Sequence, residues 1–290
     1  MNADGGVTDV PRAVAAAKAI VSALGLAFDE GIVLHASNRL ALRLLPSDIL
    51  ARVAVSAHGA AQLEVDLATR LVSIDSPIAA LDSRVPPRVY ERDGFAITLW
   101  RYYPAQPARE LLPATYAEAL ARLHSGMQRV HLATPHFTDR VQEAEGIVRS
   151  HEPTPELSDA DRTLLIDTFD TVTHAIRNYG AAEQLLHGEP HPGNVLNTRG
   201  GPLFIDLETC CRGPVEFDLA HVPEAVSECY RGIDQALLRE CRILVLAMVA
   251  AWRFDPADRF PSGRQAAREL LSALRAGPPY PALGAITGLN

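Results

Sequence analysis

Residues 187–194 constrain the folding of this chain most strongly, because they cannot form a regular element. The stretch reads His-Gly-Glu-Pro-His-Pro-Gly-Asn. Proline has no amide proton to donate within a helix, and glycine weakens helices and strands, so two of each in eight positions predict an irregular loop. The polar side chains at 187, 189, 191 and 194 therefore lie where core packing does not require them. This arrangement favours a chemical role for the loop.

A β-hairpin is predicted directly after this loop. Short apolar runs at 195–196 and 203–205 flank the turn sequence Arg-Gly-Gly-Pro at 199–202, as is typical of a hairpin. With the turn centred near Gly200, Asn194 lies opposite Asp206, and directly opposed residues have Cβ atoms roughly 4.5–5.5 Å apart. Such oxygen ligands suit Mg²⁺, which usually takes one or two carboxylates and leaves other positions to phosphates and water. We therefore expect Asn194 and Asp206 to be metal ligands and Glu189 to be a base for a substrate hydroxyl.

These residues resemble a known family, the aminoglycoside phosphotransferase and choline kinase group of small-molecule kinases, which are relatives of the protein kinases. The family's catalytic loop reads His-Gly-Asp-x-His-x-x-Asn, and a hairpin and Ile-Asp-x-Glu follow it. Here the loop at 187–194 and Ile205-Asp206-Leu207-Glu208 correspond, and the later signature Gly-Pro followed by Asp-Leu-Ala lies at 213–220. The resemblance extends over roughly residues 20–255. One departure is that Glu189 stands where the family has an aspartate, which puts the base one methylene further out.

The resemblance implies an α+β, protein-kinase-like fold of two lobes. A small, β-rich N-terminal lobe (residues 1–102) would bind the nucleotide. A larger, mostly helical C-terminal lobe (residues 103–290) would carry the catalytic loop and the metal-binding hairpin. The implied cofactors are ATP and Mg²⁺. The implied activity is transfer of the γ-phosphoryl group to a hydroxyl of a small molecule, such as an aminoglycoside, amino sugar or amino alcohol.

The N-terminal residues have the element order that such a small lobe requires. A helix is predicted at 11–24, strands at 31–35, 40–44 and 49–55, and a helix at 60–72. Kinases hold the ATP phosphates with a lysine on the third strand, which a glutamate on the next helix orients. Lys18, the single lysine of the chain, precedes every strand and cannot take that place.

By resemblance, the phosphate-binding cation is therefore Arg52 and its helix partner is Glu64. Arginine keeps the positive charge and can grip phosphate through two parallel hydrogen bonds, although it is not isosteric with lysine. The alternatives are that Arg52 is a solvated strand residue and that Glu64 is an ordinary exposed helix carboxylate.

Other nucleotide contacts follow from the same resemblance. The loop Ser37-Asn38 would cover the phosphates, although it has no glycine-rich signature. A hairpin around Asp93-Gly94 leads into the segment 98–102, where the family's interlobe linker binds adenine. Trp100 and Tyr102 are thus expected at the nucleotide, with core packing as the alternative for Trp100.

In the C-terminal part, helices are predicted at 113–131, 158–179 and 234–252. Ser158 caps the second of these helices. His187, Glu208 and Asp218 are expected to be scaffold residues, with Asp218 anchoring the catalytic loop.

The composition of the chain limits the classes of partner that we expect. The formal net charge of −8 and the pI of about 5.7 argue against nucleic acid as a partner. The longest apolar run, 243–252, is about half the length needed to cross a bilayer, so no membrane association is expected. The four cysteines show neither metal-ligand spacing nor a disulfide framework, which suggests a reducing, cytoplasmic location. The acceptor and the oligomeric state are left open.

Two further functions are compatible with the sequence. Because a misplacement near 1 Å can cost on the order of a hundredfold in rate, the longer Glu189 leaves open a nucleotide-binding regulator with little kinase activity. A His-x-Glu-x-His string could also belong to a metalloenzyme of another kind. The intact pair Asn194 and Asp206 favours the active kinase, because a degenerate protein need not keep it.

Overall fold

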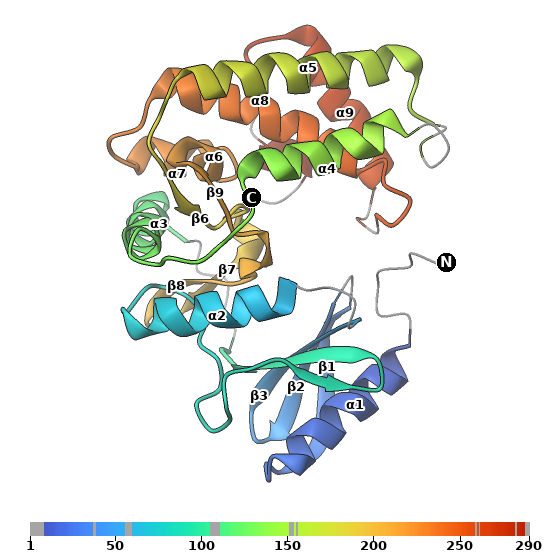
Figure 1. The fold of residues 1–290 in the computed structure, drawn as a ribbon, viewed down its shortest axis with the longest axis vertical. Coiled ribbons are helices and arrows are strands. Elements are labelled where there is room, and N and C mark those ends of the chain that lie inside the picture. Colours follow the sequence, from blue (N-terminus) through green and yellow to red (C-terminus); the bar gives the residue numbers. More distant parts are fainter. Residues whose placement is uncertain are drawn as a thin grey trace. The chain divides into compact units, whose positions relative to one another are not determined.

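The computed structural model describes residues 9–36, 39–55, 60–104, 111–150, 154, 156–258, 260, 262–281 and 283–287. These residues group into two units, one from the ranges 1–109 and 196–208 and the other from the ranges 110–195 and 209–290. The first unit is built mainly of strands and the second mainly of helices (Figure 1).

The N-terminal unit contains a five-stranded antiparallel sheet in the order β1-β2-β3-β5-β4. Side chains of β2 alternate between buried and partly exposed positions, as expected when one face of a strand packs on a core. The small side chains of Ala13, Ala16 and Ala17 are fully buried in that core and belong to the first helix. The elements are α1 Val10–Ala23, β1 Phe28–Ala36, β2 Leu40–Pro46, β3 Ile49–Val55, α2 Ala60–Ser73, β4 Tyr90–Arg92 and β5 Phe95–Arg101.

The sequence predicted the elements of this sheet in the correct order, and the third strand with its exact bounds. The first strand was predicted too short, because β1 begins at Phe28 rather than at 31. It is an edge strand whose side chains are mostly exposed, so it has no alternating pattern from which its start can be read.

A second, two-stranded sheet is formed by β7 Val195–Thr198 and β8 Gly201–Phe204, as predicted. Phe204 is fully buried. Its backbone N–H donates to Pro77 O at 2.8 Å, and its carbonyl accepts from Ala79 N at 2.9 Å. These bonds tie the segment 196–208 to the N-terminal unit.

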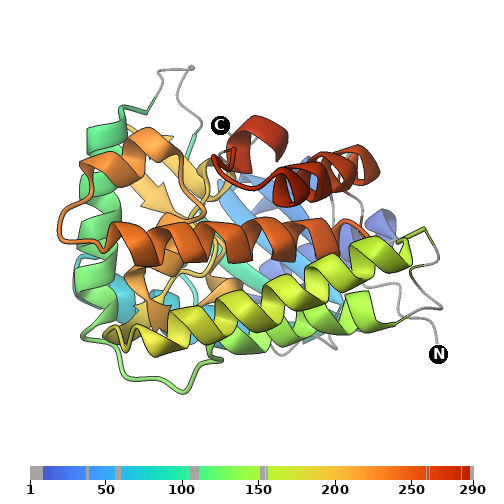
Figure 2. The same ribbon diagram turned by 90° about the horizontal axis from the view of Figure 1, so that it is seen from above.

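The C-terminal unit is organised around α8 Gln235–Trp252, which is buried along most of its length. Helices α4, α5, α6 and α9 pack against it, and α5 runs beside α8 in both views (Figures 1 and 2). Ser158 caps α5 by accepting from Asp161 N, as predicted. The other elements are α3 Pro113–Met127, α4 Phe137–Arg149, α5 Asp159–Asn178, β6 Glu183–Leu186, η1 Pro192–Asn194, η2 Leu207–Thr209, β9 Cys211–Pro214, α6 Val215–Leu219, α7 Glu224–Cys229, α9 Gly263–Ala276 and α10 Leu283–Thr287.

Strands β6 and β9 pair antiparallel. The first ends directly before the loop at 187–194, and the second leads into α6, so their pairing brings the start of this loop close to the start of α6. Among the described residues, no helix combines the length and the apolar character that a membrane span needs.

Candidate active site

The start of the predicted catalytic loop (residues 187–194) is held by the buried carboxylate of Asp218 on α6. This carboxylate accepts hydrogen bonds from His187 N at 2.9 Å and from Gly188 N at 2.8 Å, and it lies 2.9 Å from His124 Nε2. Burial acts to raise the pKa of Asp218, but the hydrogen bond and charge of His124 and the Gly188 amide outweigh it, so the pKa lies below its usual value. The prediction that Asp218 anchors the loop is confirmed.

The backbone conformation and the close packing at position 188 both require glycine. Its φ is +91°, in the region that favours glycine. A Cβ atom at this position would lie 2.0 Å from Thr209 O. The Thr209 hydroxyl also donates to His187 O at 3.0 Å. The loop therefore depends on close backbone contact with the residue that follows the hairpin.

Glu189 forms an ion pair with Arg140 of α4. The side chains are 21% and 14% exposed, respectively, so both are mostly buried and keep a small contact with solvent. The guanidinium of Arg140 lies 5.1 Å from the centre of the Trp252 ring, an attractive cation–π geometry. The sequence did not indicate Arg140, because nothing along α4 distinguishes this arginine from the others. Its position beside Glu189 comes only from the packing of α4.

Asn194 ends the short helix η1 and braces the catalytic loop. Its Nδ2 donates to Glu189 O at 3.0 Å. The amide nitrogen is thus used within the loop, and the amide oxygen is the atom suited to a cation. Asn194 belongs to the C-terminal unit and Asp206 to the N-terminal unit, so their opposition across the hairpin stays a prediction.

The N-terminal unit brings together the predicted cation and its helix partner. Arg52 on β3 pairs with Glu64 on α2 through Nη1, and its Nη2 lies 2.6 Å from Asp206 Oδ1. Glu64 is fully buried, and its Oε1 also accepts from Leu207 N at 3.2 Å. Burial acts to lower the pKa of Arg52, but Glu64 and Asp206 outweigh it and raise the pKa above its ordinary value. The predicted ion pair is confirmed, and neither residue is a solvated surface group.

A second arginine, which the sequence did not indicate, completes this network. Arg39 Nη1 lies 2.9 Å from Glu64 Oε2 and 3.8 Å from Asp206 Oδ1, and Nη2 pairs with Glu208. Arg39 directly precedes β2, so its place next to α2 and the hairpin depends on the assembled sheet. The predicted scaffold residue Glu208 acts here as a partner of Arg39.

The predicted adenine contacts lie at the end of β5. Trp100 is 4% exposed and its indole N–H donates to Thr98 Oγ1 at 2.8 Å, with the Arg52 guanidinium 5.9 Å from its ring centre. Tyr102 follows the strand, and the Arg43 guanidinium lies 4.1 Å from its ring centre. Their contact with adenine stays a prediction. The predicted phosphate-covering loop, Ser37 and Asn38, lies outside the described residues.

Asp206 and Asn194, each taken within its own unit, carry an oxygen donor of the kind that a hard cation binds. Within the described ranges, no group of three or more His, Cys, Asp or Glu side chains could hold a metal ion by itself. The carboxylate of Asp206, whose side chain is 31% exposed, and the amide oxygen of Asn194 are two hard donors. Mg²⁺ typically takes few protein ligands and completes its shell with phosphates and water.

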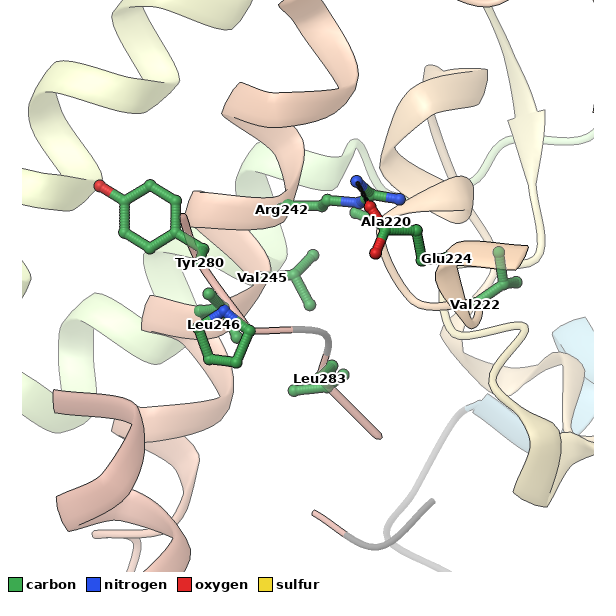
Figure 3. Close-up of a pocket in the computed structure, with 9 residues that line it drawn as sticks. Ala220, Val222, Glu224, Arg242, Val245, Leu246, Tyr280 and Leu283 are labelled. Atoms are coloured by element: carbon green, nitrogen blue, oxygen red, sulfur yellow. Dashed lines mark hydrogen bonds and ion pairs between the residues drawn. The ribbon is translucent and has the colours of Figure 1, made fainter. Parts of the chain in front are cut away.

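A small cavity in the C-terminal unit lies between α8, the residues that follow α6 and the segment 280–283. It has a volume of about 20 Å³ and is lined partly by Val222, Val245 and Leu246 (Figure 3). Glu224 and Arg242 face each other at one side, 3.5 Å apart. This volume suits about one water molecule, so the cavity as it stands does not accommodate an acceptor of sugar size.

Comparison with solved structures defines the class of the fold. The structure of amicoumacin kinase hAmiN, in complex with AMP-PNP, Ca²⁺ and Ami, has a TM-score of 0.67 at 11% identity and covers 91% of this chain and 95% of that chain. The GDP and kanamycin complex of APH(2")-IIIa has a TM-score of 0.67 at 15% identity, with 90% and 98% coverage. A choline/ethanolamine kinase family protein from Mesorhizobium loti has a TM-score of 0.64 at 15% identity, with 90% and 93% coverage.

The chain therefore has the protein-kinase-like α+β fold that the sequence predicted, with a β-sheet N-terminal region and a helical C-terminal part. The sequence profile of the phosphotransferase enzyme family matches residues 32–244. This match covers more than half of the chain, and the protein belongs to that family. No curated protein matches the chain in a sequence comparison.

Proposed function

We propose that the protein is an ATP-dependent kinase that transfers the γ-phosphoryl group to a hydroxyl of a small molecule. The observation that carries this proposal is the ion pair of Arg52 with the buried Glu64, in which Arg52 also reaches Asp206. A buried carboxylate that holds a cation beside a second, partly exposed carboxylate suits the binding of a nucleotide with a metal. Membership of the phosphotransferase family supports it, as do the nucleotides in the similar structures.

The proposed roles follow from what phosphoryl transfer demands of a protein, which is mainly positioning and neutralisation of charge. Arg52 binds phosphate oxygens, and Glu64 fixes its guanidinium. Asp206 and Asn194 hold Mg²⁺, which when bound neutralises charge on the phosphates. Glu189 accepts or orients the proton of the acceptor hydroxyl.

The tight hold on the catalytic loop supports a catalytic role for Glu189. Asp218 binds two consecutive backbone amides of the loop, and Asn194 binds the carbonyl of Glu189 itself. Arg140 restrains the side chain of Glu189, which is longer than the aspartate that the family has at this position. Preorganisation of this kind keeps a base in position without further cost during the reaction.

The first experiment measures nucleotide binding by calorimetry with and without Mg²⁺. Asp206→Asn removes the ligand charge and keeps the shape, so it should abolish Mg²⁺-dependent ATP binding while circular dichroism stays unchanged. Equal ATP affinity in the variant and the wild type, with Mg²⁺ present, would refute the assignment of Asp206.

The second experiment measures ATP consumption against aminoglycosides, amino sugars and amino alcohols. With a confirmed acceptor, Glu189→Gln should lose turnover by about 10²–10⁴-fold, as expected for loss of a general base, and should keep ATP binding. Glu189→Asp restores the usual family residue and should retain activity. If the wild type turns over no acceptor and Glu189→Asp gains activity, the protein is a nucleotide-binding regulator rather than a kinase.

A further inference from the structure

We infer that Arg39 is a second phosphate-binding cation, and that Arg39 and Arg52 together occupy Asp206 until a nucleotide triphosphate draws them away. The inference rests on the proposed function and deepens it, because it specifies how nucleotide binding frees the carboxylate of Asp206 for the metal. The ligand is the phosphate chain of a metal-bound nucleoside triphosphate.

The geometry places Arg39 and Arg52 as equivalent partners of one buried carboxylate. Glu64 uses Oε1 for Arg52 and Oε2 for Arg39, the latter at 2.9 Å. Both arginine side chains are 15% exposed, so each is ordered by the protein but still has access to solvent. A guanidinium carries five donors in a planar fork, and Glu64 uses only part of this capacity in each arginine.

Asp206 Oδ1 is the point on which both arginines converge. Arg52 Nη2 lies 2.6 Å from this oxygen and Arg39 Nη1 lies 3.8 Å from it. A divalent cation that approached Asp206 alone would meet two positive groups at the same oxygen, and like charges at this distance repel. A triphosphate offers both arginines new anionic partners, so its arrival frees the carboxylate for the metal.

The formal charges of the cluster favour a nucleotide that brings its metal. Two guanidinium groups face three carboxylates, those of Glu64, Asp206 and Glu208, which leaves one net negative charge. A triphosphate without a metal would add several negative charges beside Asp206, and a divalent cation offsets part of them. The nucleotide should therefore bind together with its metal.

Arg92 provides a matched control for Arg39. It lies on β4 of the same sheet. It pairs with Asp93 at 3.6 Å, with side chains that are 48% and 60% exposed, and has no ion pair with Glu64 or Asp206 among those described. Removing Arg92 deletes an arginine from the N-terminal unit and leaves the network in place.

The experiment measures three affinities by calorimetry or competition: Mg-ATP, adenosine and Mn²⁺ without nucleotide. Arg39→Ala should weaken Mg-ATP binding by about ten- to a hundredfold, the usual worth of a hydrogen bond to a charged group. Adenosine affinity should stay within about twofold, because the base and ribose do not contact this cation. Mn²⁺ affinity should rise, because one of the two competing charges has left Asp206. Arg39→Lys should recover part of the Mg-ATP affinity.

In Arg39→Ala the affinity for Mg-ATP should fall while the affinity for Mn²⁺ rises, and these opposite changes distinguish a binding role from a structural one. A variant that is merely misfolded loses affinity for all three ligands, and Arg92→Ala should change none of the three affinities. Equal Mg-ATP affinity in Arg39→Ala and the wild type, or parallel loss of adenosine and Mn²⁺ binding, would overturn the inference and leave the proposed function standing. If the wild type itself binds no nucleotide, the proposed function fails together with the inference.

Discussion

The substitution Glu64→Gln tests the buried network at its centre. Glutamine keeps the shape of the side chain but offers one acceptor oxygen, whereas Glu64 accepts from Arg52 and Leu207 N at Oε1 and from Arg39 at Oε2. The amide group must therefore turn donors towards one guanidinium. Two cations lose their shared counter-charge inside the N-terminal unit.

The size of the effect can be worked from burial and the remaining partners. Removing one member of a buried ion pair costs about 3–5 kcal/mol. Arg39 and Arg52 are each 15% exposed and keep Glu208 and Asp206 as neighbours, so we expect the lower end, about 3 kcal/mol. With a urea m-value of about 2 kcal/mol per M, the unfolding midpoint should fall by about 1.5 M.

Tryptophan fluorescence provides an assay that distinguishes the two units. The chain has two tryptophans, Trp100 in the N-terminal unit and Trp252 in the C-terminal unit. In a Trp252→Phe background, urea unfolding reports on the surroundings of Trp100, where Glu64→Gln should act. Asp66→Asn, two residues along the same helix and bonded to Gln62 on the surface, is the control and should change stability by at most about 0.5 kcal/mol. A midpoint for Glu64→Gln as close to wild type as that of the control would refute the reasoning.

Three further predictions concern the C-terminal unit. Gly188→Ala should lower the free energy of unfolding by at least about 3 kcal/mol and abolish turnover, because the added Cβ meets Thr209 O at 2.0 Å with φ at +91°; urea unfolding close to wild type would contradict this. Burial lowers the pKa of His221 to about 4, so the unfolded state binds a proton that the folded state refuses and stability falls as pH drops below about 6.5. Between pH 7 and 5 this loss in the free energy of unfolding should be about 2 kcal/mol. Unfolding curves of His221→Gln should lack this part of the pH dependence, and the same dependence on pH in His221→Gln and the wild type would contradict the prediction. Arg140→Leu should release Glu189 and reduce kcat by about ten- to a hundredfold with the KM for ATP unchanged, and a rise in that KM with kcat unchanged would place Arg140 at the nucleotide instead.

Much of the fold could be predicted because local patterns specify it. The sheet of the N-terminal unit follows from strand-length apolar runs separated by turns, and its third strand was predicted with exact bounds. Ser158 and Asp234 mark the starts of α5 and α8, and both accept from backbone amides of the first turn. The edge strand β1 was the weakest prediction, because a strand without a buried face carries no periodic signal.

The residues of the candidate site could be predicted from the sequence only in part. Glu189, Asn194 and Asp206 could be singled out because each belongs to a motif of fixed spacing within one short stretch of chain. The pairing of Arg52 with Glu64, across 12 residues, was implied by the family resemblance once the order of the strands and helices had been predicted. The structure confirmed this pairing. It also showed that Glu64 is fully buried, which could not be predicted from its position on the helix alone.

By itself, the sequence determined the irregular loop at 187–194 and the hairpin after it, because glycine, proline and apolar spacing act on neighbouring residues. The class of the fold was implied by the resemblance of its motifs to the phosphotransferase family. Only the tertiary structure showed that Arg39 and Arg140 also pair with the carboxylates of the candidate site. Arg39 reaches Glu64 across 25 residues and Arg140 reaches Glu189 across 49, and nothing local distinguishes them in a chain whose basic residues, with one exception, are arginine. An ion pair between distant elements depends on where packing brings two side chains, and this information is carried by the assembled core rather than by any short segment.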